Sequence, residues 1–463
     1  MVDVVTFFLF TALVAFIAYR YTRNENLDSS DGYFLGGRSL IGPIICGSLM
    51  LTNLSTEHIV GMNGSAFREG FVIAAWETLA AIAAIALALF FLPRYLKSGF
   101  TTLPQFLEER YDSKTRLITA ILFLLSYVVA LLPVVLYSGA LAIEGLFNVS
   151  EAFDLDKTTT LWGLIWSIGT LGSLYAIFGG LKAVAISDTI NGIGLLIGGL
   201  MVPFFGLRYI GNGSISQGLQ TLWTEHPEKF NMVGSADSSL PWSTLFTGMI
   251  IAQVYFWCAN QSIIQRTLGA KNLAEGQKGV LLTGFLKILG PIIVVLPGII
   301  AWHIFGGQLE NGDQAYPTLV RTVLPGFLTG FFAAVVMGAV LSTFNSGLNS
   351  AATLFSIDIY KAVLNPDASE HKMVLFGKYT GSILAFGAML IAPFMANAPD
   401  GLYILLQALN GIFNVPILTI VFIGLVTKRV PALAAKIVLV VEPILYILTN
   451  FVIKIELHFL HMM

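Results

Sequence analysis

One stretch of this sequence places hydroxyl, amide, carboxyl and imidazole groups inside an apolar segment. Residues 48–67 read SLMLTNLSTEHIVGMNGSAF, with the polar run between Thr52 and His58. Polar groups persist at membrane depth only where protein buries them or where they line a water-filled cavity. A short re-entrant or interfacial stretch would also fit. We favour a broken helix whose unwound middle supplies a ligand site near the membrane midplane.

A second polar cluster lies within the apolar segment 325–356, in the sequence MGAVLSTFNSGLNSAATLF. Its polar positions cover one broad helical face. Small residues and hydroxyls at such positions commonly mediate helix packing in membranes. Alternatively, hydroxyls and the carbonyls of a broken helix could hold a hard cation, which takes oxygen ligands. The two polar stretches together favour a cation site. The cluster comprises Ser342, Thr343, Asn345, Ser346, Asn349 and Ser350.

Glu77 and Lys287 stand alone in otherwise apolar segments. A buried acid and base in a membrane bundle usually pair or face a shared cavity. Nearby amides and aromatic rings suit a polyhydroxylated or amide-bearing solute, although each ring is also an ordinary core residue. These are Gln253, Asn260, Gln261, Gln265 and Gln407, with Trp76, Phe256, Trp257 and Tyr403.

The composition is that of a polytopic membrane protein. Of 463 residues, 56% are hydrophobic and 11% are charged, against about 25% charged in soluble chains. The net charge of −2 gives no case for nucleic-acid binding. Cys46 and Cys258 lie in apolar spans and indicate packing. No nucleophile triad or metal cluster is recognisable, so we expect no enzyme.

The apolar runs are long enough for about twelve membrane-spanning helices. The first is expected to be a retained helix, since it lacks a basic leader region. The longest polar loop, 209–242, is expected to carry short surface helices. The predicted spans are 4–20, 40–62, 71–95, 116–146, 160–178, 183–208, 243–265, 278–304, 325–356, 374–396, 402–426 and 432–455.

The spans divide into two groups of five, 40–208 and 243–426. An odd number of helices in each group makes the two halves inverted in the membrane. The leading part, 1–39, and the last part, 427–463, flank this core. Most of the 25 Lys and Arg residues, Arg266 among them, fall in loops that are cytoplasmic if the N-terminus is outside. We therefore predict an N-terminus outside a plasma (inner) membrane.

Five segments give the chain a specific resemblance to the sodium:solute symporters, most closely to their sodium/sugar (glucose/galactose) branch. They extend from the second predicted span to the ninth and so cover most of the chain. The resemblance implies a LeuT-type fold with two inverted five-helix repeats and flanking helices. The segments are DGYFLGGRSL (31–40), SLMLTNLSTEHIVGMNGSAF (48–67), YAIFGGLKAVAISDTIN (175–191), FWCANQSIIQRTLGAKN (256–272) and LNSAATLFSIDIYK (348–361).

The resemblance also implies residue roles. A sodium site would use the carbonyls of Leu51, Leu54 and Ala339 with the hydroxyls of Ser342 and Thr343. A sugar site would use His58, Glu77, Gln253, Lys287 and Gln407. An outer gate would comprise Met62, Trp76 and Tyr403, with Phe256 as an inner gate. Asp188 would lie on the path of sodium toward the cytoplasm.

Some positions depart from the sugar branch. Ala80 stands where a sugar-binding hydroxyl is found, and Gln407 is placed by its spacing to Gly411. Members of the branch also usually carry two further helices at the C-terminal end.

The predicted function is sodium-coupled symport of a monosaccharide or similar polyol by alternating access. A carrier of the same fold for another solute, or one coupled to protons through His58 and Glu77, is the alternative. A membrane sensor that binds solute without transport is a more distant one. The expected partners are the sugar, Na+ and the lipid bilayer.

Overall fold

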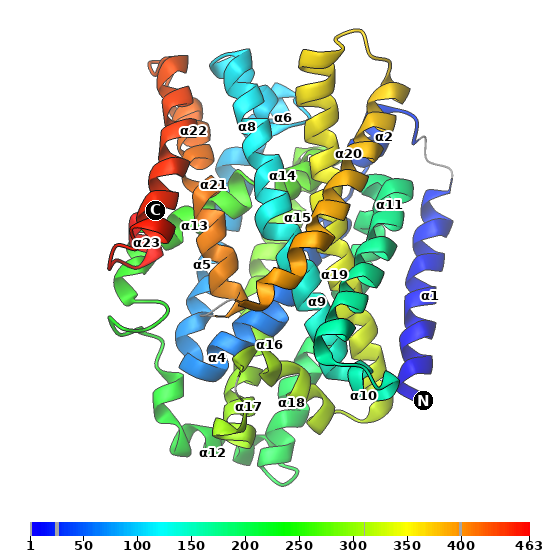
Figure 1. Ribbon diagram of the computed structural model, residues 1–463, viewed down its shortest axis with the longest axis vertical. Helices are drawn as coiled ribbons and strands as arrows, with labels where there is room; N and C mark the ends of the chain where they lie inside the picture. The colour runs from blue at the N-terminus through cyan, green and yellow to red at the C-terminus, as the bar shows by residue number, and fades with distance from the viewer. Residues whose placement is uncertain (1, 24–26, 310, 398–400) are drawn as a thin grey trace.

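The computed structural model describes residues 2–23, 27–309, 311–397 and 401–463. Helices make up nearly all of this part of the chain, and its single β-bridge pairs Leu40 with Ala270. Most of the long helices run along the vertical axis of one bundle (Figure 1). The predicted all-α class is confirmed.

Nine helical segments of the described chain are long and apolar enough to cross a membrane. The other three predicted spans, 40–62, 160–178 and 243–265, are also helical, and each contains or adjoins a helix break. The nine segments are Val2–Thr22, Glu57–Ser98, Ser113–Phe147, Gly180–Ile210, Leu273–Phe305, Gly326–Leu364, Glu370–Ala396, Leu402–Val426 and Ala432–Val452.

The first break separates α3 (Gly42–Asn53) from the π-helical η2 (Glu57–Met62), which continues into α4 (Asn63–Glu69). The amide of Leu54 still donates to the carbonyl of Met50, but the residue itself has left helical geometry, with φ −84° and ψ 68°. Helical bonding resumes where the amide of Ile59 donates to the carbonyl of Ser55. The predicted break in this span is therefore present.

The second break lies between α13 (Gly248–Cys258) and α14 (Gln261–Leu268). Asn260 starts the new helix because its Oδ1 accepts a hydrogen bond from the amide of Ser262 at 2.9 Å. Asn is a favoured N-cap residue for this reason. A third break interrupts α11 (Lys157–Ile210) at Gly180, whose φ of 62° suits glycine.

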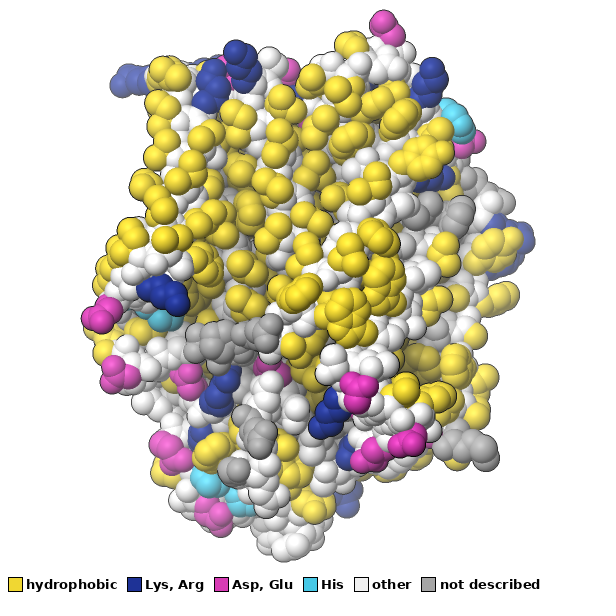
Figure 2. Space-filling model, in the orientation of Figure 1, with side chains coloured by type: hydrophobic (Ala, Val, Ile, Leu, Met, Phe, Trp, Pro, Cys, Tyr) yellow, Lys and Arg dark blue, Asp and Glu magenta, His cyan; other side chains and the backbone are white. Residues whose placement is uncertain are grey.

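The broken helices lie at the centre of the bundle. Helix α3 packs against α11, α15 (Leu273–Leu286) and α19 (Gly326–Leu354), whereas α13 packs against α5 (Ala75–Ala86) and α21 (Leu402–Val426). Helix α1 (Val2–Thr22) stands at one edge along α11 and α19, and α22 (Ala432–Ile447) stands at the other along α21 (Figure 1). Hydrophobic side chains cover much of the bundle's side in Figure 2, and charged ones gather toward its ends.

Short helices cover the end of the bundle at which the N-terminus lies, called the N-terminal face below (Figure 1). The 209–242 segment contributes α12 (Ile215–Glu225) and η6 (Pro227–Phe230). They adjoin α17 (Leu296–Phe305), and α18 (Ala315–Val323) lies on the same face. The expected surface helices of this polar loop are confirmed.

Candidate ion and substrate site

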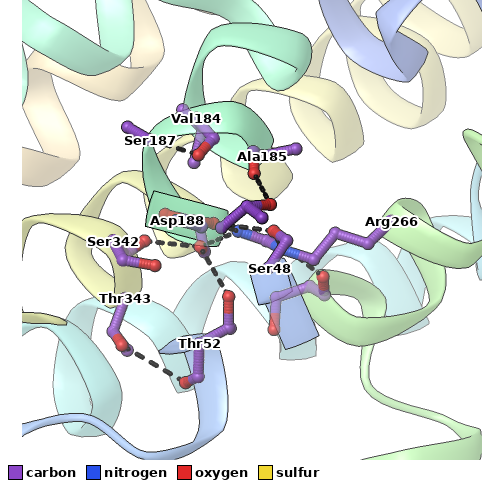
Figure 3. Close-up of polar contacts among 12 residues, drawn as sticks. Ser48, Thr52, Val184, Ala185, Ser187, Asp188, Arg266, Ser342 and Thr343 are labelled. Atoms are coloured by element: carbon purple, nitrogen blue, oxygen red, sulfur yellow. Dashed lines mark hydrogen bonds and ion pairs between the residues drawn. The ribbon is translucent and has the colours of Figure 1, made fainter. Parts of the chain in front are cut away.

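The break in the first helix packs directly against α19. Thr343 Oγ1 donates to the carbonyl oxygen of Thr52 at 3.2 Å (Figure 3), and Ser55 Oγ donates to the carbonyl oxygen of Ala339 at 3.5 Å. Leu51 and Leu54 are fully buried at the end of α3, where carbonyl groups lose their helical donors. The residues predicted to bind sodium therefore lie on two segments that are in contact.

Ser342 lies one residue before Thr343 on α19, and its side chain is buried. Its hydroxyl oxygen makes no hydrogen bond of good geometry among the described residues, although it interacts with the nearby carboxylate of Asp188. Most buried polar atoms in proteins make a well-formed hydrogen bond, so the absence of one here calls for an explanation. A bound cation would supply one, because the hydroxyl oxygen can serve as a ligand.

A buried ion pair adjoins this region and involves both halves of the chain. Asp188 Oδ2, from α11, lies 3.3 Å from Arg266 Nη2, from α14. Ser48 Oγ donates to Asp188 Oδ2 at 2.7 Å and accepts from Arg266 Nε at 2.7 Å. Arg266 Nη2 also donates to the hydroxyl of Ser346, which lies 3.4 Å from Thr52 Oγ1. Figure 3 shows Asp188 and Arg266 meeting beside Thr52.

The assignment of Arg266 to a loop charge was wrong. The residue is 1% exposed, because α14 continues the second broken helix into the core and Asp188 compensates the guanidinium charge. A local signal for the helix was present in the sequence, since Asn260 is a favoured N-cap residue and the helix that it begins includes position 266. The partner lies 78 residues away in the sequence and gave no local signal.

Glu77 and Lys287 form a second buried ion pair, with 2.5 Å between Glu77 Oε2 and Lys287 Nζ. Of the two arrangements expected for the isolated acid and base, pairing or facing a shared cavity, the structure shows pairing. Lys287 Nζ also donates to Asn53 Oδ1, at the end of α3. Gly290 leaves room for the acid, since a Cβ atom there would lie 2.1 Å from Glu77 Oε2.

A cavity of about 50 Å³ lies beside the first break. Of the predicted site residues, His58, Gln253, Phe256, Tyr403 and Gln407 line it. Glu77, Lys287, Trp76 and Met62 lie outside its lining. Asn53 lines the cavity and also contacts Lys287, so it connects the ion pair to this space. Gln253 Nε2 donates to the carbonyl oxygen of Trp76 at 2.9 Å.

Aromatic rings close one side of the cavity. The ring of Tyr403 packs edge-on against His58 at 5.3 Å and against Trp76 at 5.4 Å between centroids. Met62, Trp76 and Tyr403 are all at most 2% exposed. Phe256 and Gln407 are only half-buried, and Gln407 Nε2 donates to Tyr403 Oη at 3.1 Å. The cavity is therefore sealed at Tyr403 and less enclosed toward Phe256.

Several polar residues that line the cavity were not expected from the sequence. Asn410 and Asn414 follow Gln407 on α21 at helical spacing, and Tyr127 of η5 (Tyr127–Leu131) also lines the cavity. The one-sided spacing of the three amides in an apolar helix was a usable signal. Tyr127 carried no signal, since a lone tyrosine in an apolar run is typical of a core. Its hydroxyl donates to Asn260 Oδ1 at 3.4 Å.

A second polar contact closes the N-terminal face, outside the membrane-spanning segments. Asp313 lies in η10 (Gly312–Gln314), and its Oδ2 accepts from the amide of Leu402 at 3.2 Å. Gly64 of α4 approaches closely, since a Cβ atom there would lie 2.5 Å from Asp313 Oδ1. Burial raises the pKa of Asp313 to about 6, despite the opposing effects of the Leu402 amide and the Arg68 charge.

A nearly all-helical bundle with broken helices packed inside it has the architecture of the LeuT fold, which is found among secondary transporters. A family model described as "Sodium:solute symporter family" matches residues 33–439. The chain belongs to the sodium:solute symporter family, whose members are transporters and not enzymes, and sodium is its coupling ion.

Three similar proteins illustrate this membership. The chain is 50% identical to an uncharacterized symporter, YidK, of Escherichia coli (strain K12), covering 100% of this chain and 81% of that protein. It is 32% identical to a sodium/glucose cotransporter of Vibrio parahaemolyticus, covering 92% and 81%. It is 29% identical to a sodium/myo-inositol cotransporter of Mus musculus, covering 92% and 64%.

The fold is similar to that of a Na+-coupled sialic acid symporter, solved in a substrate-bound outward-open state. The TM-score is 0.82 at 20% identity, and the match covers 97% of this chain and 92% of that one. The expected LeuT-type fold is confirmed.

The Glu77–Lys287 pair generates a stability prediction. Lys287→Met leaves the carboxylate of Glu77 buried without its base, which typically costs about 3–5 kcal/mol. The double variant Glu77→Gln/Lys287→Met removes both charges and should recover most of the lost stability. The measurement is thermal unfolding of the purified proteins in detergent, with exposed Lys454→Met as the control. Equal losses in the single and double variants would contradict this account.

The raised pKa of Asp313 generates a pH prediction. A carboxyl group whose folded-state pKa lies above its ordinary value contributes stability at low pH, which is lost as the pH rises through about 6. The packing at Asp313 should therefore be more stable at pH 5 than at pH 7.5. Asp313→Asn should reduce this difference, whereas exposed Asp367→Asn should leave it unchanged. Thermal unfolding across this pH range checks the prediction, and identical pH profiles for Asp313→Asn and the parent protein would refute it.

Proposed function

We propose that this protein is a sodium-coupled symporter of a monosaccharide, glucose- or galactose-like, or of a similar polyol. The observation that carries the proposal is the contact of Thr52 and Asn53, neighbours in sequence, with two different regions. Thr52 contacts α19 at the candidate ion site, and Asn53 contacts Lys287 beside the cavity. Two relatives are cotransporters of sodium with glucose and with myo-inositol, which supports a polyhydroxylated substrate.

The proposed sodium site comprises the carbonyls of Leu51, Leu54 and Ala339 with the hydroxyls of Ser342 and Thr343. Neutral oxygen ligands suit a hard monovalent cation. The buried hydroxyl of Ser342, which makes no hydrogen bond of good geometry, supports this assignment. Asp188, the proposed ion-path residue, forms an ion pair with Arg266 next to the sodium site. Because the carboxylate compensates the guanidinium charge, the arginine adds little net positive charge near the cation.

The proposed substrate site comprises His58, Gln253 and Gln407 at the cavity, with Glu77 and Lys287 reached through Asn53. Amide and imidazole groups can donate to and accept from sugar hydroxyls. A cavity of about 50 Å³ holds a few water molecules. Sugar entry would therefore require lining side chains to move, and we assign Phe256 as the inner gate.

We assign Met62, Trp76 and Tyr403 as the outer gate. With the N-terminus outside a plasma membrane, the N-terminal face is extracellular, and the complete burial of these three residues corresponds to an outwardly closed state. Residues 40–208 and 243–426 would form the two inverted repeats, with 1–39, 209–242 and 427–463 outside them. Alternating access then follows from rocking of one group of helices against the other.

Coupling between ion and sugar follows from the shared end of α3. Sodium would hold Thr52 and the break against α19, and the adjacent Asn53 would thereby be fixed beside Lys287. A site ordered in this way binds sugar more tightly, and linkage requires the sugar to tighten sodium binding equally. Each sodium ion that crosses 100 mV supplies about 2.3 kcal/mol.

Proton coupling within the same fold is the second candidate. His58 Nδ1 lies 3.6 Å from Glu57 Oε1 at the cavity wall, so an imidazole and a carboxylate adjoin the substrate space. An imidazole can both donate and accept a proton. The buried Ser342 oxygen, which makes no hydrogen bond of good geometry, favours sodium.

The test is uptake of a panel of radiolabelled hexoses and inositols into proteoliposomes, with an imposed sodium gradient or an imposed proton gradient. Sodium-dependent accumulation of one compound above its external concentration is expected. Accumulation driven by the proton gradient alone would overturn the ion assignment. The absence of uptake for every polyol, with folded protein in the vesicles, would overturn the substrate class.

The sodium site makes its own prediction. Ser342→Ala/Thr343→Ala should raise the sodium concentration for half-maximal uptake by about tenfold or more, which corresponds to about 1.4 kcal/mol or more. Ser350→Ala, on the same helix, removes a hydroxyl that bonds to Gln265 and serves as the matched control. Unchanged sodium dependence in the double variant, at normal thermal stability, would rule out this location.

A further inference from the structure

Three side chains with metal-binding groups converge on the N-terminal face, away from the ion and substrate site. Glu225 and His226 end α12, and His303 lies in the last turn of α17. One ligand atom of each residue can be chosen so that all three lie within 4.8 Å of one another. Among the described residues, no other group of three or more His, Cys, Asp and Glu residues meets this condition.

The separations fit a tetrahedral metal. His226 Nε2 and His303 Nδ1 are 3.2 Å apart, and His303 Nδ1 lies 3.5 Å from Glu225 Oε2. Two nitrogens bound to one tetrahedral Zn²⁺ at about 2.0–2.1 Å are separated by about 3.4 Å. Two imidazoles and one carboxylate are a known zinc ligand set, and they leave a fourth position for water.

A neighbouring carboxylate orients one of the ligands. Glu228 Oε1 lies 3.6 Å from His226 Nδ1, the ring nitrogen that does not face His303. A carboxylate at that distance favours the proton on Nδ1 and leaves the lone pair of Nε2 for the metal. Such outer contacts are a regular feature of protein metal sites.

Water and ions can reach the three side chains. The side chain of Glu225 is 59% exposed, and those of His226 and His303 are 23% and 20% exposed. The cluster therefore combines an entry path with ligands that are partly fixed by packing. The rings of His226 and His303 stand edge to face with 5.3 Å between centroids.

The cluster joins two segments that already bracket α4, the outer half of the first broken helix. Lys229, three residues after His226, donates to the carbonyl oxygen of Phe67 at 3.1 Å and to that of Arg68. Its ammonium group also lies 3.8 Å from the ring centre of Trp302, the residue before His303. A metal bound here would strengthen the link between the 209–242 segment, α17 and the end of α4.

We infer that Glu225, His226 and His303 form a binding site for a divalent transition metal of the Zn²⁺ type, which ties the 209–242 segment to α17. The site is distinct from the proposed sodium site in its ligand chemistry, since imidazole nitrogens select transition metals over Na+. It is also independent of the proposed transport activity.

The test measures binding of Zn²⁺ to the full-length protein in detergent, prepared without a polyhistidine tag. Titration calorimetry gives affinity and stoichiometry, and visible absorption of the Co²⁺-substituted protein reports tetrahedral coordination. We expect one Zn²⁺ per chain at this site and a rise in the thermal unfolding temperature with added Zn²⁺. His226→Ala and His303→Ala should each weaken this binding at least tenfold, and Glu228→Gln should weaken it less.

His371→Ala is the matched control, because that imidazole also faces a carboxylate, Asp28, but is 71% exposed and belongs to no group of three metal-binding side chains among the described residues. It should leave Zn²⁺ binding unchanged. His303→Gln, which retains a polar side chain of similar size, serves if the alanine variant fails to fold. Zn²⁺ affinity and stoichiometry equal to those of the parent protein in folded His226 and His303 variants would overturn the inference.

Discussion

The buried guanidinium of Arg266 is the constraint around which the centre of the bundle is arranged. It contacts Asp188 of α11, Ser48 of α3 and Ser346 of α19, so that one side chain joins four helices. An arginine at this depth is tolerated only with a compensating charge and filled hydrogen bonds. Any movement of α14 relative to α11 must keep these partners or replace them with water. The residues proposed to bind sodium lie beside this network, where Thr52 Oγ1 approaches Ser346.

The ends of broken helices turn this electrostatic arrangement into a coupling device. Because α3 ends at Asn53, two successive residues at its end can contact different parts of the protein. Thr52 contacts α19, while Asn53 contacts the lysine of the Glu77–Lys287 pair. A displacement of α19 or of Lys287 therefore acts on neighbouring residues of the same helix end. In an unbroken helix the carbonyl groups accept hydrogen bonds from the helix itself, so fewer backbone oxygens could bind a ligand.

The sequence predicted the all-α membrane class and the break within residues 48–67, because length and polarity within an apolar run are local properties. It also predicted that Glu77 and Lys287 would either pair or face a shared cavity, since neither charge could remain alone in lipid. It failed where the decisive partner is distant in the chain. Arg266 follows the predicted end of its span directly, and only the position of Asp188 reveals that it is buried. The helical spacing of Asn410 and Asn414 could have indicated that they share a face with Gln407. The position of Tyr127 depends on tertiary packing alone.

The Glu77–Lys287 and Asp188–Arg266 pairs share an order along the chain: each acid, at 77 and 188, precedes both bases, at 266 and 287. During synthesis the acidic half enters the membrane first, before its counter-charges exist. A carboxylate at the middle of an isolated helix costs about 2.5–3.5 kcal/mol to insert. Until the later half of the chain is synthesised, each acid must therefore be protonated, or be shielded by water and by the insertion machinery. Synthesis of the second half thus supplies the bases that stabilise the first half in the membrane. A chain released before that point would carry two unpaired acids in its membrane-spanning helices and would be unstable there.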